Sequence, residues 1–149
     1  MRHLILLLAL FTLSLGTVKG QDVPANQVPE AVTAAFSSDF SNARDIEWEK
    51  NPSFYEVEFE TRWGRDHEAR YDSDGNLLYH KEEIPNREIP DEITNRINTE
   101  FEGYKIDDAD KIIEGEQTRY LLSLEAKGMD DIDVLIGEDG EIISQIYDD

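Results

Sequence analysis

Apolar residues recur along the chain with two periods, first that of a helix and then that of a strand. From Val28 to Phe40 they return every three or four positions, and from Ile89 to Phe101 they do so again. This spacing puts one apolar stripe on each predicted helix. Pro29 stands where the first turn of a helix tolerates a missing N–H donor. The pattern therefore predicts two helices, each with one buried side.

After each predicted helix, apolar and polar residues alternate one by one. Residues 55–60 and 67–71 show this period of two in the first half, and residues 120–124 and 132–136 show it in the second. Such alternation is typical of an antiparallel sheet with one buried and one solvated face. Turn signals separate the segments: Asn51-Pro52, Trp63-Gly64, Asp74-Gly75, Gly115, Lys127-Gly128 and Asp139-Gly140.

The second half of the chain resembles the first. Val28-Pro29-Glu30 and Ile89-Pro90-Asp91 lie 61 positions apart, and Asp74-Gly75 and Asp139-Gly140 lie 65 apart. Ordered similarity of this kind indicates a repeat. We therefore predict an α+β fold: a tandem repeat of a helix plus about four antiparallel strands, forming one curved antiparallel sheet with helices on one face.

The start of the chain has the order of a secretory signal peptide. Arg2 and His3 precede an apolar run over residues 4–15, and a small residue, Gly20, stands before Gln21. We expect cleavage there and a periplasmic or secreted protein. The predicted organisation is a signal peptide at 1–20, an N-terminal linker at 21–27, a first repeat at 28–82, a linker at 83–88 and a second repeat at 89–149.

Composition excludes several chemistries. The chain has no cysteine, which removes disulfides, zinc–thiolate sites and thiol nucleophiles. Its formal net charge is −20, and the part after residue 20 holds 12 basic and 34 acidic residues. A surface this acidic repels phosphate backbones and anionic lipids. We therefore expect no nucleic-acid partner and no membrane insertion after signal cleavage.

The pattern from Val28-Pro29-Glu30 through Asp45-Ile46-Glu47-Trp48 to Tyr55-Glu56-Val57-Glu58-Phe59 resembles the PepSY-like, or β-lactamase-inhibitor-like, proteins. That family consists of periplasmic or secreted proteins frequent in Bacteroidetes. The resemblance covers residues 28–147. It implies helices packed behind a curved antiparallel sheet whose concave face can hold a partner, with inhibition of an exported enzyme as one form of that role.

Motifs for metal binding or catalysis have simpler explanations. With Gly75 at position 6 of a calcium loop, Arg70 and Lys81 occupy the positions that need acids, so the segment 72–77 is predicted to be a hairpin turn. His67 alternates in step with Ala69 and Tyr71, the residues of its strand that are expected to be buried, and His80 stands at a strand end. Nucleophile motifs such as Gly-x-Ser-x-Gly are absent from the sequence. We predict no catalytic residue, no metal site and no cofactor.

The remaining candidates point to binding. Trp63 lies in a predicted hairpin tip, unless it folds back over the sheet edge, and aromatic and arginine side chains are common in binding hot spots. The candidate binding residues are Arg62, Trp63, Arg65, Arg70, Glu56, Glu58 and Glu60. We expect a non-enzymatic module that binds a protein or peptide of the cell envelope through the open sheet face and hairpin tips. The alternative is a divalent-cation-binding or envelope-associated structural protein that uses its acidic face.

Overall fold

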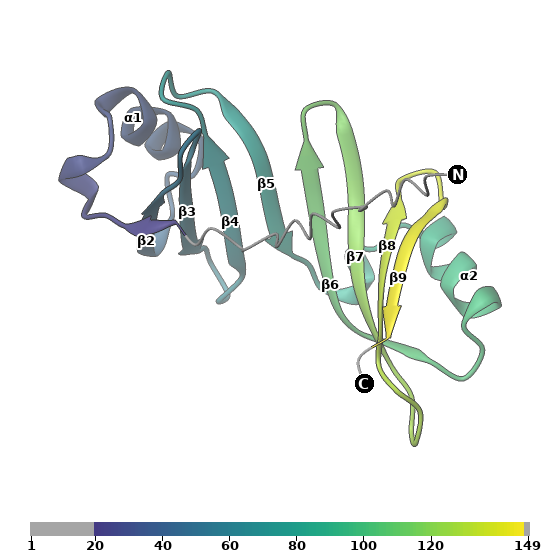
Figure 1. Cartoon of the computed structure of the whole chain (residues 1–149). Helices are drawn as coiled ribbons and strands as arrows, with labels where there is room; N and C mark the ends of the chain where they lie inside the picture. Colours follow the sequence, from purple (N-terminus) through teal and green to yellow (C-terminus); the bar gives the residue numbers. More distant parts are fainter. Residues whose placement is uncertain (1–19, 148–149) are drawn as a thin grey trace, which may run out of the picture.

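The computed structural model describes residues 20–147. The predicted signal peptide therefore lies outside the described residues, apart from Gly20. Figure 1 shows a row of strands with one helix beside each end of the row. Within residues 20–147, neither helix is long and apolar enough to cross a membrane.

Both predicted helices are present, α1 at Glu30–Asp39 and α2 at Asp91–Glu100. Each begins directly after a proline, Pro29 or Pro90, whose φ is −54° or −55°. That angle is the one that the pyrrolidine ring imposes, so the prolines direct the chain into the first turn. The buried helical side chains belong to the predicted stripes: Val32, Phe36, Ile93 and Ile97.

Within residues 20–147, nine strands follow one another in the sheet in the order of the sequence. They are β1 (Gln21–Asp22), β2 (Arg44–Lys50), β3 (Tyr55–Glu60), β4 (Asp66–Tyr71), β5 (Leu77–Glu83), β6 (Lys105–Glu114), β7 (Gln117–Glu125), β8 (Ile132–Gly137) and β9 (Ile142–Tyr147). Short 3-10 turns, η1 (Ala25–Gln27) and η2 (Asn86–Glu88), precede the two helices. Every neighbouring pair is antiparallel.

The predicted fold class is wrong as a description of the whole molecule. The described residues form one continuous nine-stranded antiparallel sheet with two helices of ten residues each, not a tandem repeat of helix-plus-strand units. The joining strands, β5 and β6, pair over five registered positions from Tyr79↔Glu114 to Glu83↔Asp110. Hydrogen bonding therefore runs through the middle of the chain without a break, and the fold is sheet-rich α+β.

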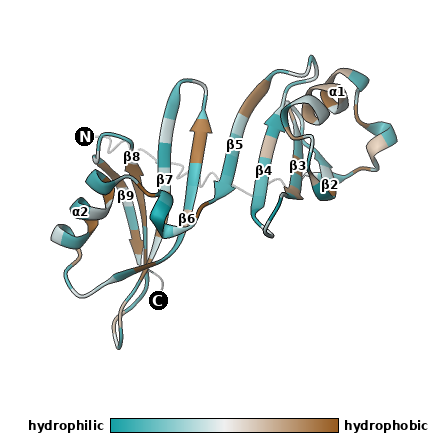
Figure 2. Ribbon diagram, turned by 180° about the vertical axis from the view of Figure 1, so that it is seen from behind, coloured by the Kyte–Doolittle hydropathy of each residue, from teal (hydrophilic) through white to brown (hydrophobic). Residues whose placement is uncertain are grey.

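The buried side chains form two separate clusters. The first gathers around α1 and includes Phe36, Trp48 and Phe59. The second gathers around α2 and includes Leu122 and Leu124. Figure 2 shows both polar and apolar stretches on the strands. Buried and more exposed residues alternate along β4 and β8, as expected where one sheet face packs and the other is solvated. We call the face of β3–β5 that bears Val57, Ala69 and His80 the helix-side face.

The segment that resembles a calcium loop is a hairpin turn, as predicted. Asp72 accepts hydrogen bonds from the backbone N–H groups of Asp74 and Asn76, at 3.0 and 2.9 Å. Gly75 has a φ of +86°, and a Cβ added there would lie 2.6 Å from the backbone oxygen of Ala31 in α1. Glycine is therefore needed both for the turn and for the close approach of the turn to the helix.

Candidate functional site

Carboxylates line up across three neighbouring strands on one face of the sheet. Glu58 on β3 pairs directly with Glu47 on β2 and with Glu68 on β4, and Glu68 pairs with Lys81 on β5. Directly paired residues point to the same face, and like charges in such pairs destabilise a sheet. We call the face of β2–β6 that bears these four residues the open face. It concentrates negative charge at a cost in stability.

A hollow of about 730 Å³ lies on the open face and is lined mainly by carboxylates. Its acidic residues are Asp45, Glu47, Glu58, Glu60, Asp66, Glu68, Glu83, Asp108 and Asp110. Lys81 and His67 are the basic residues in the lining, and the Nζ atom of Lys81 lies 3.3 Å from Glu68. Burial raises the pKa of Asp110, although the nearby Lys81 ammonium opposes that shift. The hollow has the charge of a site for a cationic ligand.

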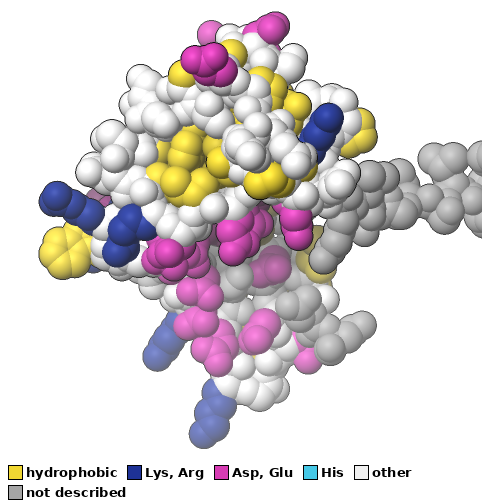
Figure 3. All heavy atoms as spheres, turned by 90° about the vertical axis from the view of Figure 1, so that its left-hand side faces the viewer, with side chains coloured by type: hydrophobic (Ala, Val, Ile, Leu, Met, Phe, Trp, Pro, Cys, Tyr) yellow, Lys and Arg dark blue, Asp and Glu magenta, His cyan; other side chains and the backbone are white. Residues whose placement is uncertain are grey.

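Acidic side chains also gather on one side of the molecular surface. Figure 3 shows Asp and Glu side chains gathered in a band below a hydrophobic area, on the side of the molecule that lies to the left in Figure 1. Of the candidate glutamates, Glu58 and Glu60 line the hollow, whereas Glu56 does not.

Glu56 and Arg70 form a clamp beside the hollow. The Arg70 guanidinium lies 2.6 Å from carboxylate oxygens of both Glu56 and Glu68, and it covers the Tyr79 ring at 4.5 Å. Burial raises the pKa of Glu56, and the hydrogen bond from Arg70 opposes that shift. The Arg70 charge is thus already matched by two carboxylates, and the clamp stiffens the open face between β3 and β5.

Trp63 stands at the tip of the hairpin between β3 and β4. Its side chain is 93% exposed, so it does not fold back over the sheet edge. Its φ is +75°, a left-handed conformation that costs an L-residue free energy. Arg62 is exposed beside it, and both residues line a shallow hollow with Arg44. An exposed indole on a strained backbone is the kind of feature that binding sites retain.

The structure does not gather the three candidate arginines on one surface. The Arg65 guanidinium hydrogen-bonds to Glu82 at 3.1 Å and to Glu88 at 2.6 Å. The bond to Glu88 is the main cause that raises the Arg65 pKa. Arg62 and Arg65 line one hollow together with Trp63, whereas Arg70 lies on the open face.

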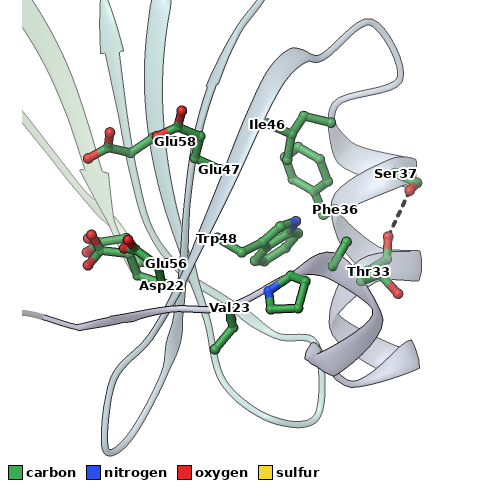
Figure 4. A pocket seen from close by; sticks show the side chains of 13 residues that line it. Asp22, Val23, Thr33, Phe36, Ser37, Ile46, Glu47, Trp48, Glu56 and Glu58 are labelled. Carbon is green, nitrogen blue, oxygen red and sulfur yellow. Dashed lines mark hydrogen bonds between the residues drawn. The ribbon is translucent and has the colours of Figure 1, made fainter.

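A second hollow, of about 670 Å³, lies between α1 and the edge of the sheet. Figure 4 shows Phe36, Trp48 and Val23 on one side of it and carboxylates, including Glu47 and Glu58, on the other. Residues 21–27, expected to be a linker, contribute β1 and η1 to its wall. Sequence reasoning missed this hollow, because only the folded chain brings residues near position 23 against α1.

The two histidines of the described chain come together, which the sequence did not predict. His67 is buried, as expected from its strand phase, but His80 packs against Phe40 with ring centroids 4.9 Å apart. His67 Nδ1 lies 3.1 Å from His80 Nε2. Burial lowers the pKa of both imidazoles. The pairing of β4 with β5 decides this contact, and no local signal marks it.

Comparison with known proteins identifies relatives of this architecture. A family described as "Putative beta-lactamase-inhibitor-like, PepSY-like" matches residues 16–79 and again residues 64–144. None of the curated proteins matches the chain.

Solved structures from Bacteroides share the fold. A DUF2874 family protein from Bacteroides uniformis is 19% identical, with a TM-score of 0.67 over 80% of this chain and 88% of its own. A BLIP-like protein from Bacteroides fragilis is 19% identical, with a TM-score of 0.65 over 84% of this chain and 87% of its own. A protein from Bacteroides eggerthii, described as periplasmic, is 18% identical, with a TM-score of 0.69 over 80% and 88%.

Proposed function

Because the chain belongs to the "Putative beta-lactamase-inhibitor-like, PepSY-like" family, we propose that it is a non-enzymatic binding module that holds a cationic segment of a protein partner on its open face. The observation that carries the proposal is the hollow on that face, in which nine carboxylates surround one lysine. Glu47, Glu58 and Glu68 stand in direct register there. A basic segment would relieve their repulsion on binding.

The chemistry of the hollow favours arginine over lysine in the partner. A guanidinium can bond two carboxylate oxygens at once, and the neighbouring Arg70 already does so with Glu56 and Glu68. The carboxylates of the hollow come from β2, β3, β4, β5 and β6, so an extended segment lying across the strands meets acids along its length. Such contacts speed association and weaken as salt is added.

Trp63 would supply an apolar anchor at one border of this surface. Its indole is free of contacts that the fold requires, since it is 93% exposed. A partner that covers it buries a large aromatic surface, which is typical of a hot spot. Charge on the open face would then raise the rate at which the partner associates, and Trp63 would lower the rate at which it dissociates.

The carboxylates fit a charged surface better than an acid–base pair. Glu56 and Asp110 both have a raised pKa, but they lie on β3 and β6, three strands apart. Strand spacing puts them roughly 14 Å from each other. Paired carboxylates in glycosidases stand within about 10 Å of each other.

We propose that the protein works in the periplasm or outside the cell. This location agrees with the predicted signal peptide and with the description of the Bacteroides eggerthii protein.

The test is binding of labelled peptides of equal length, one rich in arginine, one in lysine and one in glutamate, followed by fluorescence anisotropy. We expect the arginine peptide to bind at low salt, the lysine peptide more weakly and the glutamate peptide not at all. The double variant Glu58→Gln/Asp108→Asn should weaken binding at least tenfold.

The matched control is Glu102→Gln/Glu116→Gln, which removes two exposed acids outside the hollow. Equal loss in both double variants would show that total charge alone attracts the peptide, which would contradict a site on the open face. If no peptide bound while Ca²⁺ raised the melting temperature of the wild type and not that of Glu58→Gln/Asp108→Asn, the alternative of a cation-binding face would replace the proposal.

A further inference from the structure

Three side chains from β4 and β5 converge on the helix-side face, beside the end of α1. His67 pairs with Glu82 in the strand register, and His80 is the partner of Ala69, so all three side chains point to the same face. The ligand atoms of His67, His80 and Glu82 lie within 4.8 Å of one another. This cluster is separate from the open face, because Lys81 and Glu83 alternate with His80 and Glu82 along β5.

We propose that His67 Nδ1, His80 Nε2 and a Glu82 carboxylate oxygen form a binding site for a divalent transition metal ion, with Zn²⁺ as the best match. Zinc–nitrogen bonds of about 2.0–2.1 Å at tetrahedral angles hold two imidazole nitrogens about 3.3 Å apart. The two nitrogens are 3.1 Å apart in this structure. Two imidazoles, one carboxylate and a water molecule are an established zinc ligand set.

The surroundings hold the histidines in place. Thr61 Oγ1 lies 2.8 Å from His67 Nε2, so the hydroxyl oxygen can accept a hydrogen bond from Nε2–H, and in that tautomer Nδ1 is unprotonated and can bind a metal. Phe59 stacks on His67 at 4.9 Å, and the Phe40 ring lies 4.9 Å from that of His80. These rings restrict the orientation of both imidazoles, as the apolar shell of a metal site does. Burial also lowers the pKa of both imidazoles, which favours the neutral form that binds metal.

Glu82 can approach the ion because Arg65, which now hydrogen-bonds to it, also hydrogen-bonds to Glu88. Arg65 hydrogen-bonds to Glu82 through Nη1, but Nη1 and Nη2 also bond to Glu88 at 3.2 and 2.6 Å. Arg65 can thus remain paired with Glu88 while Glu82 turns toward the histidines. A hollow of about 420 Å³, lined by Thr61, Arg65 and Glu82 among others, gives water access for the fourth ligand.

The test uses tag-free protein treated with a chelator and then titrated with Zn²⁺ by calorimetry, and with Co²⁺ by visible absorption. We expect one equivalent of Zn²⁺ to bind and Co²⁺ to give the strong visible bands of a four-coordinate site. Excess Ca²⁺ or Mg²⁺ should not displace the Zn²⁺, because these ions prefer oxygen ligands. His80→Gln should weaken Zn²⁺ binding at least a hundredfold, and Glu82→Gln at least tenfold.

Glu83→Gln is the matched control, since it removes the same charge from the next residue, which points to the opposite face. It should leave Zn²⁺ binding unchanged. Equal affinity in wild type and Glu82→Gln, or displacement of Zn²⁺ by Ca²⁺, would overturn the proposal. If the histidine variant fails to fold, the anomalous signal of a zinc-soaked wild-type crystal decides. A peak between His67, His80 and Glu82 would support the site. A peak elsewhere, or no peak, would overturn it and leave only a hydrogen-bonded histidine pair.

Discussion

Replacement of Trp63 tests whether the hairpin tip serves the fold or serves binding. The side chain is 93% exposed, so Trp63→Ala removes almost no burial. The strain of the left-handed φ of +75° stays about the same in that variant, because alanine carries a Cβ as tryptophan does. We therefore expect the free energy of unfolding to change by no more than about 0.5 kcal/mol.

Trp63→Gly separates the backbone from the side chain. A left-handed L-residue costs about 1–2 kcal/mol, and glycine removes this cost while adding about 0.5–1 kcal/mol of chain entropy in the unfolded state. The glycine variant should thus be more stable than the alanine variant by about 0.5–1 kcal/mol. For a domain of this size, that difference corresponds to a rise in melting temperature of roughly 2–5 °C.

Gly64→Ala is the control within the same turn. Gly64 has a φ of +67°, and a Cβ there would meet no atom within 4 Å, so only backbone strain changes. This variant should be destabilised by about 1 kcal/mol. Urea unfolding and differential scanning calorimetry measure all three. A loss of several kcal/mol in Trp63→Ala would refute an exposed tip, and equal stability of Trp63→Gly and Trp63→Ala would refute the left-handed backbone.

Three further predictions follow from buried or strained positions. Gly75→Ala should lower the free energy of unfolding by about 1–2 kcal/mol more than Gly140→Ala does, as measured by urea unfolding. Both glycines have a positive φ, but only a Cβ at Gly75 would meet a backbone atom at 2.6 Å. An equal loss in both variants would contradict the tight packing of that turn. Tyr71→Phe should lower stability by about 1.5–3 kcal/mol, since the buried hydroxyl donates a 2.9 Å hydrogen bond to the Asp39 carboxylate; calorimetry would show no change if water replaced that bond. Asp110→Asn should stabilise the protein at pH 7, because burial raises the folded-state pKa of Asp110 above the ordinary 3.8. The sign follows from proton linkage, because the folded state binds the Asp110 carboxyl proton more tightly than the unfolded state does. The gain in free energy of unfolding from Asp110→Asn should therefore shrink as pH falls through the raised pKa and vanish below about 3.8. An advantage that did not change with pH would rule out this explanation.

The sequence alone determined the local elements of this protein. The stripes around Phe36 and Ile97 predicted both helices, and the alternation in residues 55–60 predicted a strand that the structure confirms as β3. The Asp74-Gly75 turn also followed from the sequence, since glycine readily takes the positive φ found there. These features depend on residues close together in the chain, and so a linear pattern can carry them.

The tertiary structure decided which distant residues share a surface. The pairing of β5 with β6 makes the sheet continuous through the middle of the chain and brings Asp108 and Asp110 into the hollow that Glu58 lines. The same kind of pairing, between β4 and β5, placed His80 against His67. Strand order and register come from contacts between segments far apart in sequence, and a shift of one residue would move every side chain to the other face. Periodicity gives each strand its two faces, but only the assembled sheet determines which charges and ligands meet there.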